Sequence, residues 1–293
     1  LLAVEETAAE GSPSYWFFYD ANGNVASSDD FNGKRVCYAN DLSRNLAITQ
    51  VEGLTSADTC GTYTASGAAL PAGSRKTSTQ WHPDWRLAAK VAEPSRITSY
   101  VYNGQPDPFN GNAQASCAPA SALLPDGKPI AVLCRQVEQA TTDANGSLGF
   151  SATLDSTVAN REQKWTYNQW GQVLSHDGPR TDVADLTTYT YYSDTSFTGV
   201  GSAAVGHTIG DLQSMTNAAG KVTQYTKYDK HGQLLESVDP NGPFGAKGMG
   251  EPGYVATTAA IANAIYDAIG VRFYDIPMTA EKVYKALKDK PAV

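Results

Sequence analysis

Short runs of alternating apolar and polar residues recur along most of the chain, and turns rich in Gly, Asn and Asp separate them. This alternation has the two-residue period of a half-buried β-strand. The aromatic run at residues 16–19 is followed by Asn22-Gly23, a strong hairpin signal because both residues tolerate positive φ. The same order returns at residues 164–174 and again at 225–238. The pattern therefore predicts a series of antiparallel β-hairpins.

Further strands are predicted at residues 35–38, 42–53, 97–102 and 187–192, with a hairpin at 212–223. The units are unevenly spaced, at about 20 residues, which is typical of a repeat architecture. One hairpin cannot bury its aromatic face alone, so neighbouring hairpins must stack. Residues 55–79 and 105–130 are rich in Ala, Gly and Pro or Ser, and they are predicted to be long loops.

The chain changes character after residue 240, where a Gly-rich stretch precedes two helical patterns. The first helix is predicted to begin after Thr257 or Thr258 and to stop at Gly270, a residue suited to a left-handed C-cap. The second begins after Thr279 and carries lysines towards its end. The predicted organisation is a disordered stretch or leader remnant at 1–13, a β-hairpin domain at 14–240 and an α-rich segment at 241–293.

Charge and hydropathy exclude two classes of partner. The net charge is -8, whereas nucleic-acid binding needs clustered Lys and Arg, so no nucleic-acid partner is predicted. No apolar run is long enough to cross a bilayer as a helix, so no membrane span is predicted.

The four cysteines do not have the spacing of a zinc or iron–sulfur site, so no metal site is predicted from them. Local disulfides, Cys37–Cys60 and Cys117–Cys134, are favoured because each pair brackets a Gly-, Pro- and Ala-rich loop. Each bridge would stabilise the fold by about 3 kcal/mol and would suit an exported protein. Two other pairings, or four buried thiols, remain alternatives.

The remaining candidate residues indicate structural roles. His82, His176, His207 and His231 are far apart in turn-like contexts, so exposed turn histidines are expected rather than ligands or bases. The five tryptophans could line a sugar-binding surface, but cross-strand packing is the favoured interpretation.

The β-rich part resembles the YD-repeat, or Rhs, family. The resemblance rests on Tyr-Asp pairs at 19–20 and 228–229 and on Tyr-Asn pairs at 102–103 and 167–168, followed by a turn with Gly and then apolar residues. It covers about residues 14–240. It implies a bacterial secreted or cell-surface protein whose hairpins wind into a shell. The resemblance implies other segments of a longer YD-repeat protein as partners. It implies no cofactor for the YD-repeat part. Some members enclose a C-terminal toxin, so a C-terminal cargo is a further partner that the resemblance implies.

The C-terminal part resembles another family, the large subunit of molybdenum hydroxylases of the xanthine dehydrogenase and aldehyde oxidoreductase type. Residues 245–252 read Gly-Ala-Lys-Gly-Met-Gly-Glu-Pro, and residues 259–271 and 275–279 continue the likeness, which covers about 238–289. The resemblance implies a molybdenum–pterin cofactor and Glu251 as its catalytic base, with Gly248 and Gly250 allowing the backbone close to the cofactor. A cytoplasmic or periplasmic location would accompany that activity.

The two resemblances together indicate a chimera with a junction near residues 235–242. Residues 1–237 supply no recognisable pterin-binding segment, and the chain has no cysteine pattern for iron–sulfur clusters and no flavin fingerprint. The leading expectation is therefore a structural or interaction segment of a YD-repeat protein, not an enzyme by itself. The alternative is the C-terminal part of a molybdenum-dependent hydroxylase, an oxidoreductase to which Glu251 would contribute.

Overall fold

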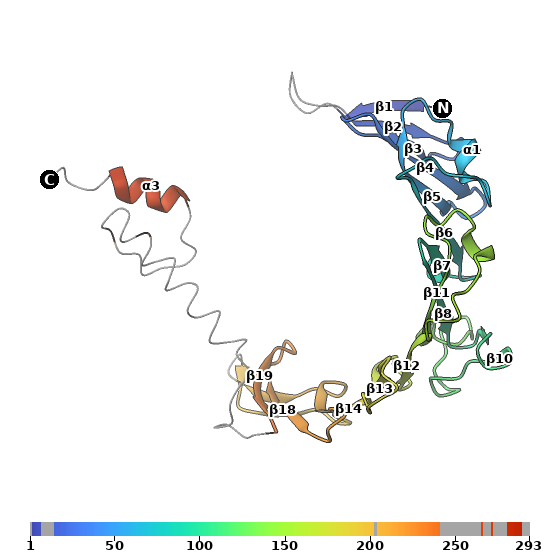
Figure 1. Cartoon of the computed structure of the whole chain (residues 1–293). Helices are drawn as coiled ribbons and strands as arrows, with labels where there is room; N and C mark the ends of the chain where they lie inside the picture. Colours follow the sequence, from blue (N-terminus) through green and yellow to red (C-terminus); the bar gives the residue numbers. More distant parts are fainter. Residues whose placement is uncertain are drawn as a thin grey trace. The chain divides into compact units, whose positions relative to one another are not determined.

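The computed structural model describes residues 2–6, 15–201, 204–240, 265, 271 and 280–288 (Figure 1). It divides into two compact units, Leu1–Ser237 and Val238–Val293. The first unit is almost entirely antiparallel β-sheet, as the alternating pattern predicted. The predicted helix at about 257–270 and the extended piece after it lie outside the described residues, except for positions 265 and 271.

The elements follow the predicted hairpins closely. The strands of the main sheet are β1 (Leu2–Glu6), β2 (Tyr15–Tyr19), β3 (Val25–Asp29), β4 (Lys34–Asp41), β5 (Leu46–Thr55), β6 (Arg75–Trp81), β7 (Ala88–Glu93), β8 (Arg96–Tyr102), β11 (Leu133–Ala140), β12 (Arg161–Tyr167), β13 (Val173–Asp177), β14 (Thr187–Tyr191), β15 (Ser196–Thr198), β16 (Val205–His207), β17 (Leu212–Thr216), β18 (Val222–Tyr228) and β19 (Leu234–Val238). A separate small hairpin joins β9 (Pro106–Asp107) to β10 (Ala113–Gln114), and the helices are α1 (Cys60–Thr64), the 3₁₀ turn η1 (Gly149–Ser151) and α3 (Ala280–Lys288).

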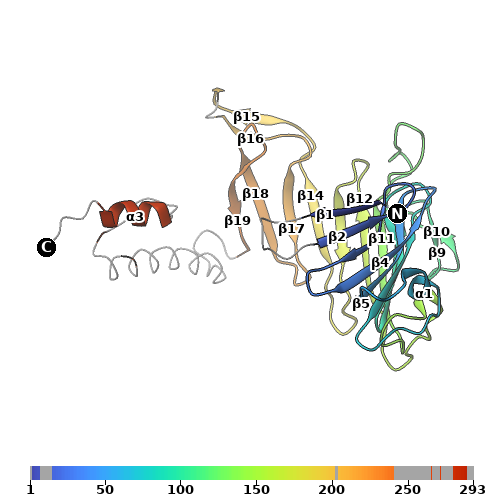
Figure 2. The same cartoon turned by 90° about the horizontal axis from the view of Figure 1, so that it is seen from above.

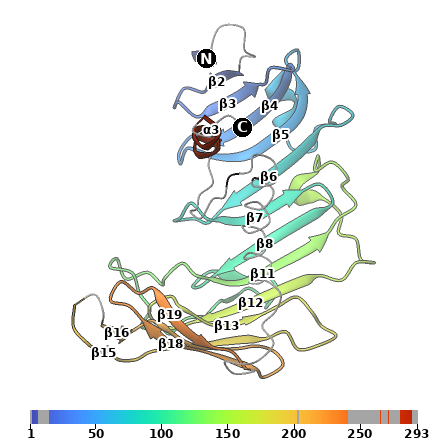
Figure 3. The same ribbon diagram turned by 90° about the vertical axis from the view of Figure 1, so that its left-hand side faces the viewer.

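Strand order in the sheet follows chain order with two interruptions. Consecutive strands pair from β1 to β8, β11 then pairs with β8, and pairing continues to β14. The next neighbour of β14 is β17, because β15 and β16 form a side hairpin that meets β18 at Gly206 and Tyr228. Figure 3 shows the strands from β2 to β13 side by side in this order, and Figure 2 shows the β15–β16 hairpin extending beside β18.

Residues 2–6 differ from the expectation of a disordered stretch at the N-terminal end. Residues 2–6 form β1 and pair antiparallel with all five residues of β2. The physical reason is that the outer edge of an aromatic strand presents unpaired backbone groups, and an extended segment next to it in the chain satisfies them.

Burial is greatest where the two long insertions return to the sheet. The first insertion contains α1 rather than only loop, and it covers β4 and β5 with a small cluster around Cys37, Val51 and Leu54. The second contains β9 and β10, and Asp107 of β9 pairs with Arg135 of β11 at 2.8 Å. The insertions therefore supply the second layer that a single sheet lacks.

The C-terminal helix was predicted correctly. α3 spans Ala280–Lys288 and carries Lys285 and Lys288 in its last turn, where positive charge complements the helix dipole.

Candidate functional site

The same turn closes several of the hairpins. In the turn after β12, the amide of Asn168 donates to the carbonyl of Gln172 at 2.9 Å, and the Asn168 Oδ1 accepts from the amides of Trp170 and Gln172, both at 3.0 Å. Gly171 takes φ 78°, which is favourable only for Gly. Equivalent bonds start at Asp20, Asp30, Asn217 and Asp229. An Asp or Asn is therefore needed at the first position because its side chain bonds the turn amides.

A tyrosine hydroxyl joins neighbouring strands beside these turns. The hydroxyl of Tyr228, at the end of β18, donates to the carbonyl of Leu212, the first residue of β17, at 2.6 Å. We name this contact, a hydroxyl at the end of one strand on the first carbonyl of the strand before it, the tyrosine clamp. The other clamps are Tyr102 to Ala88 (3.0 Å), Tyr167 to Leu133 (2.8 Å) and Tyr191 to Val173 (2.8 Å).

The clamps explain the Tyr-Asp and Tyr-Asn pairs in physical terms. Tyr167 and Tyr228 precede Asn168 and Asp229, so one residue fixes the lateral spacing of two strands and the next residue begins the turn. After Tyr102, the Asn103 Oδ1 instead accepts from the amide of Cys117, in the second insertion, at 3.2 Å. Burial raises the pKa of all four clamp hydroxyls, and it raises the pKa of Tyr102 and Tyr228 to about 12. The pair is therefore a structural device in these units, with no hydroxyl prepared as a base or nucleophile.

Replacing Asn168 with Ala should destabilise the protein by about 1–2 kcal/mol, since two turn amides lose their acceptor. Asn168→Asp is the matched control because it keeps a side-chain oxygen at the same place. Urea unfolding of both variants checks the prediction. Equal losses in the two variants would mean that the side-chain acceptor does not stabilise the turn.

The histidine prediction was wrong at three positions. His82 is only 3% exposed, and its Nδ1 accepts from the amides of Asp84 and Trp85 at 3.1 and 3.3 Å. Burial lowers the pKa of His82, so its ring is held neutral as a turn cap. His176 and His207 lie on strands and stack on Trp165 and Tyr192, and His231 alone of the four lies in an exposed turn. For the two strand histidines, the alternating pattern around them and the aromatic residues on nearby strands were the sequence signals that could have indicated stacking.

The tryptophan side chains divide between packing and exposure. Trp165 stacks on His176, its direct cross-strand partner, with ring centroids 4.9 Å apart. The indole of Trp81 donates to the carbonyl of Ala47 at 2.9 Å. Trp170 is 61% exposed at the tip of the β12–β13 turn. Cross-strand packing therefore accounts for Trp165, and a hydrogen bond to β5 fixes Trp81.

The structure contains both predicted local disulfides, Cys37–Cys60 and Cys117–Cys134. The first fastens α1 to β4, and the second fastens the second insertion to the start of β11. The bridges therefore fix the two covering layers to the sheet.

The residues predicted for the cofactor, Gly248, Gly250 and Glu251, lie outside the described residues. In the described part of the chain, no group of three or more His, Cys, Asp or Glu side chains could hold a metal ion. Among the described helices, none has the length and apolar character needed to cross a bilayer.

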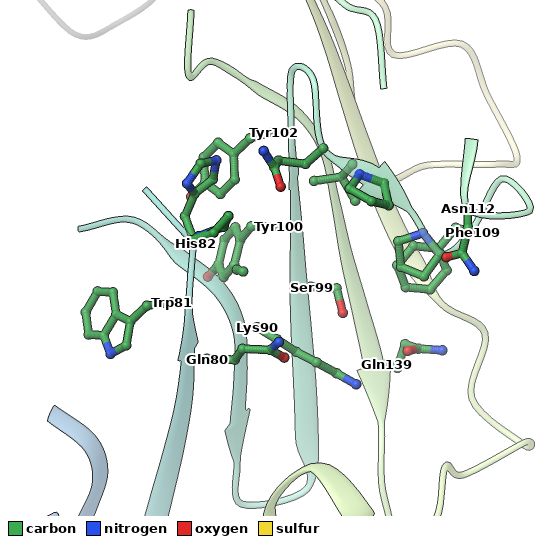
Figure 4. A pocket seen from close by; sticks show the side chains of 16 residues that line it. Gln80, Trp81, His82, Lys90, Ser99, Tyr100, Tyr102, Phe109, Asn112 and Gln139 are labelled. Carbon is green, nitrogen blue, oxygen red and sulfur yellow. The ribbon is translucent and has the colours of Figure 1, made fainter. Parts of the chain in front are cut away.

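A hollow of about 440 Å³ lies on the sheet beside the second insertion (Figure 4). Its floor includes Lys90 from β7, Ser99 from β8 and Gln139 from β11, while Phe109 and Asn112 come from the β9–β10 hairpin and its turn. Lys90 and Ser99 are direct cross-strand partners. Sequence reasoning missed this site because it depends on the register of three strands and on an insertion that returns over them.

Comparison with known proteins gives two separate likenesses. The family model of the RHS repeat matches residues 208–243, which contain β17, β18 and β19. The molybdenum-binding subunit PaoC of an Escherichia coli aldehyde oxidoreductase is 46% identical over 57 residues, which are 19% of this chain and 8% of that protein. The aldehyde oxidoreductase of Megalodesulfovibrio gigas is 55% identical over 49 residues, 17% of this chain and 5% of that protein.

Solved Tc toxin structures are also similar in part. The crystal structure of TcdB2-TccC3 without its hypervariable C-terminal region has a TM-score of 0.41 at 10% identity, covering 78% of this chain and 10% of that one. A Photorhabdus luminescens Tc holotoxin pore has a TM-score of 0.32 at 14% identity, covering 80% and 11%.

This chain thus spans a small fraction of each of these proteins. The short molybdenum-subunit matches agree with the resemblance predicted for the C-terminal segment. The RHS-repeat match contains one tyrosine clamp and two of the recurrent turns. The family match identifies residues 208–243 as an RHS repeat, and the same turn and clamp recur in earlier hairpins of the β-rich unit.

Proposed function

We propose that residues 14–240 are a structural and interaction segment of a longer, secreted or cell-surface YD-repeat protein. The observation that carries the proposal is the tyrosine clamp, which recurs between β7 and β8, β11 and β12, β13 and β14, and β17 and β18. Each clamp uses a carbonyl that every strand possesses, so the sheet can be extended unit by unit.

The last strand of the sheet supports a partner of the same kind. β19 is joined to β18 by a Lys227–Glu236 ion pair, and Leu234 and Leu235 are 45% and 53% exposed. Successive strand residues face opposite sides of a sheet, so both faces of β19 present apolar surface. A further YD unit would cover this surface and place its clamp hydroxyl on the first carbonyl of β19. The two disulfides support an oxidising compartment.

The native polypeptide in the source cells tests this proposal. An antibody raised against the β-rich unit should detect a protein much larger than 31.1 kDa in the secreted or surface fraction. Its peptides should include further Tyr-Asp units. A cytosolic band of 31.1 kDa would contradict both the scaffold role and the location.

A second candidate function rests on the 46% identity to the PaoC subunit. In that case the C-terminal segment belongs to a molybdenum hydroxylase, with Glu251 as general base and Gly248 and Gly250 beside the cofactor. These three residues lie outside the described residues. Stoichiometric molybdenum in the purified full chain, measured by elemental analysis, would favour this candidate. Glu251→Gln should keep the metal but lose hydroxylation of an aldehyde, since the carboxylate would act as a base and not as a ligand, whereas a Lys34→Met control should keep both.

A further inference from the structure

The hollow beside β7, β8 and β11 combines one cation with several uncharged polar groups. Figure 4 shows the Lys90 side chain extending toward Gln139, with Ser99 close by. Gln80 adds a second amide from β6, as the cross-strand partner of Lys90. A volume of about 440 Å³ is within the range of small-molecule sites.

The ammonium group of Lys90 has no acidic partner among the described residues. Other cations on this side of the sheet are paired, for example Lys128 with Asp84 and Arg135 with Asp107. The Lys90 Nζ lies over the ring of Phe150, 5.6 Å from the ring centroid. An aromatic face orients an ammonium group but does not neutralise its charge. The charge of Lys90 is therefore available to an anionic ligand.

The uncharged groups around Lys90 are also available. The side chains of Gln80, Ser99 and Gln139 make no hydrogen bond to the described residues. Amides and hydroxyls both donate and accept, which matches the mixed donor and acceptor character of sugar hydroxyl groups. Phe109 and the neighbouring prolines supply flat apolar surface for the C–H face of a sugar ring.

We propose that this hollow binds a sugar acid, with the ligand carboxylate on Lys90 and its hydroxyl groups on Gln80, Ser99 and Gln139. A small carboxylate alone would leave the amides and the Phe109 surface unused. A neutral sugar would leave the ammonium group without a counter-ion. A ligand that carries both a carboxylate and a hydroxylated ring uses Lys90, the uncharged polar groups beside it and the Phe109 surface together.

Titration of the full chain with glucuronate tests the site, with glucose and acetate as separate probes. Isothermal calorimetry or NMR shifts should show glucuronate binding at least tenfold more tightly than either probe. Lys90→Met should weaken glucuronate binding at least tenfold, while Lys90→Arg retains most of it. Gln139→Leu should weaken glucuronate binding but leave the response to acetate unchanged.

Lys34→Met is the matched control, because Lys34 is an exposed lysine of β4 outside the hollow. It should bind glucuronate like the unchanged chain. Equal binding of glucuronate and acetate would overturn the sugar part of the proposal, and equal binding of glucuronate and glucose would overturn the role of Lys90. No binding of glucuronate at millimolar concentration by a folded chain would overturn the proposal as a whole.

Discussion

Replacing Cys37 and Cys60 together by Ala should lower the free energy of unfolding by about 3–5 kcal/mol. The bridge closes a sequence separation of 23 residues, for which loop-closure entropy alone gives about 3 kcal/mol. Cys37 is also 0% exposed within the cluster that contains Val51 and Leu54, so losing its sulfur leaves poorly filled space. Urea unfolding monitored by tryptophan fluorescence measures the change.

Cys117→Ala with Cys134→Ala is the matched control. Its loop has a separation of 17 residues, so the entropic effect is similar, but its buried member, Cys134, is 8% exposed, against 0% for Cys37. This pair should cost about 3 kcal/mol, less than the first pair. Reducing the unchanged chain should combine both losses, because the two loops do not overlap in sequence. A loss below 1 kcal/mol for the first pair would show that α1 does not depend on its bridge.

The hairpins and the disulfides could be predicted from local signals. The alternation at residues 164–174 and the turn at Asn168 lie within one short stretch, and the local bonds of the turn are sufficient to form it. Each cysteine pair closes a short loop, so the nearest partner was also the geometrically simple partner. These features depend on contacts between residues that are close in sequence.

The features that were missed depend on distant contacts. The clamp between Tyr167 and Leu133 spans 34 residues, and the Tyr alone does not show which carbonyl it will meet. His82 was expected to be exposed because its context is turn-like, but it is buried and makes a T-shaped ring contact with Tyr102, 20 residues away in sequence. The hollow around Lys90 needs the register of β7 and β8 and the return of the second insertion. Strand register and the packing of one layer on another cannot be predicted from a short stretch of sequence, because they depend on residues that are distant in the chain.

Raising the pH from 10 to 12 should destabilise the protein through the tyrosine clamps. The pKa of Tyr102 and Tyr228 rises to about 12 in the folded chain, against 10.0 in the unfolded chain. The unfolded chain therefore loses these two protons at lower pH than the folded chain does. The contribution of the protonated hydroxyls to the free energy of unfolding is complete below pH 10 and is lost as the pH passes 12. Two pKa units correspond to about 2.7 kcal/mol for each clamp, since one unit is about 1.4 kcal/mol. Urea midpoints at pH 9, 10, 11 and 12 measure this loss.

The double variant Tyr102→Phe with Tyr228→Phe isolates the clamps from other alkaline effects. At pH 9 it should be less stable than the unchanged chain by about 1 kcal/mol per lost hydrogen bond. Between pH 10 and 12 it should lose much less. Because the loss per clamp in the unchanged chain exceeds the ~1 kcal/mol of the hydrogen bond, the two stability curves should meet and then cross. Lys76 acts in the opposite direction, because burial lowers its pKa. The destabilisation that comes from burying its positive charge therefore becomes smaller as the pH approaches 10.5. That contribution is shared by both proteins and cancels in the comparison. Parallel curves from pH 9 to 12 would mean that the clamp hydroxyls ionise as freely in the folded sheet as in the unfolded chain.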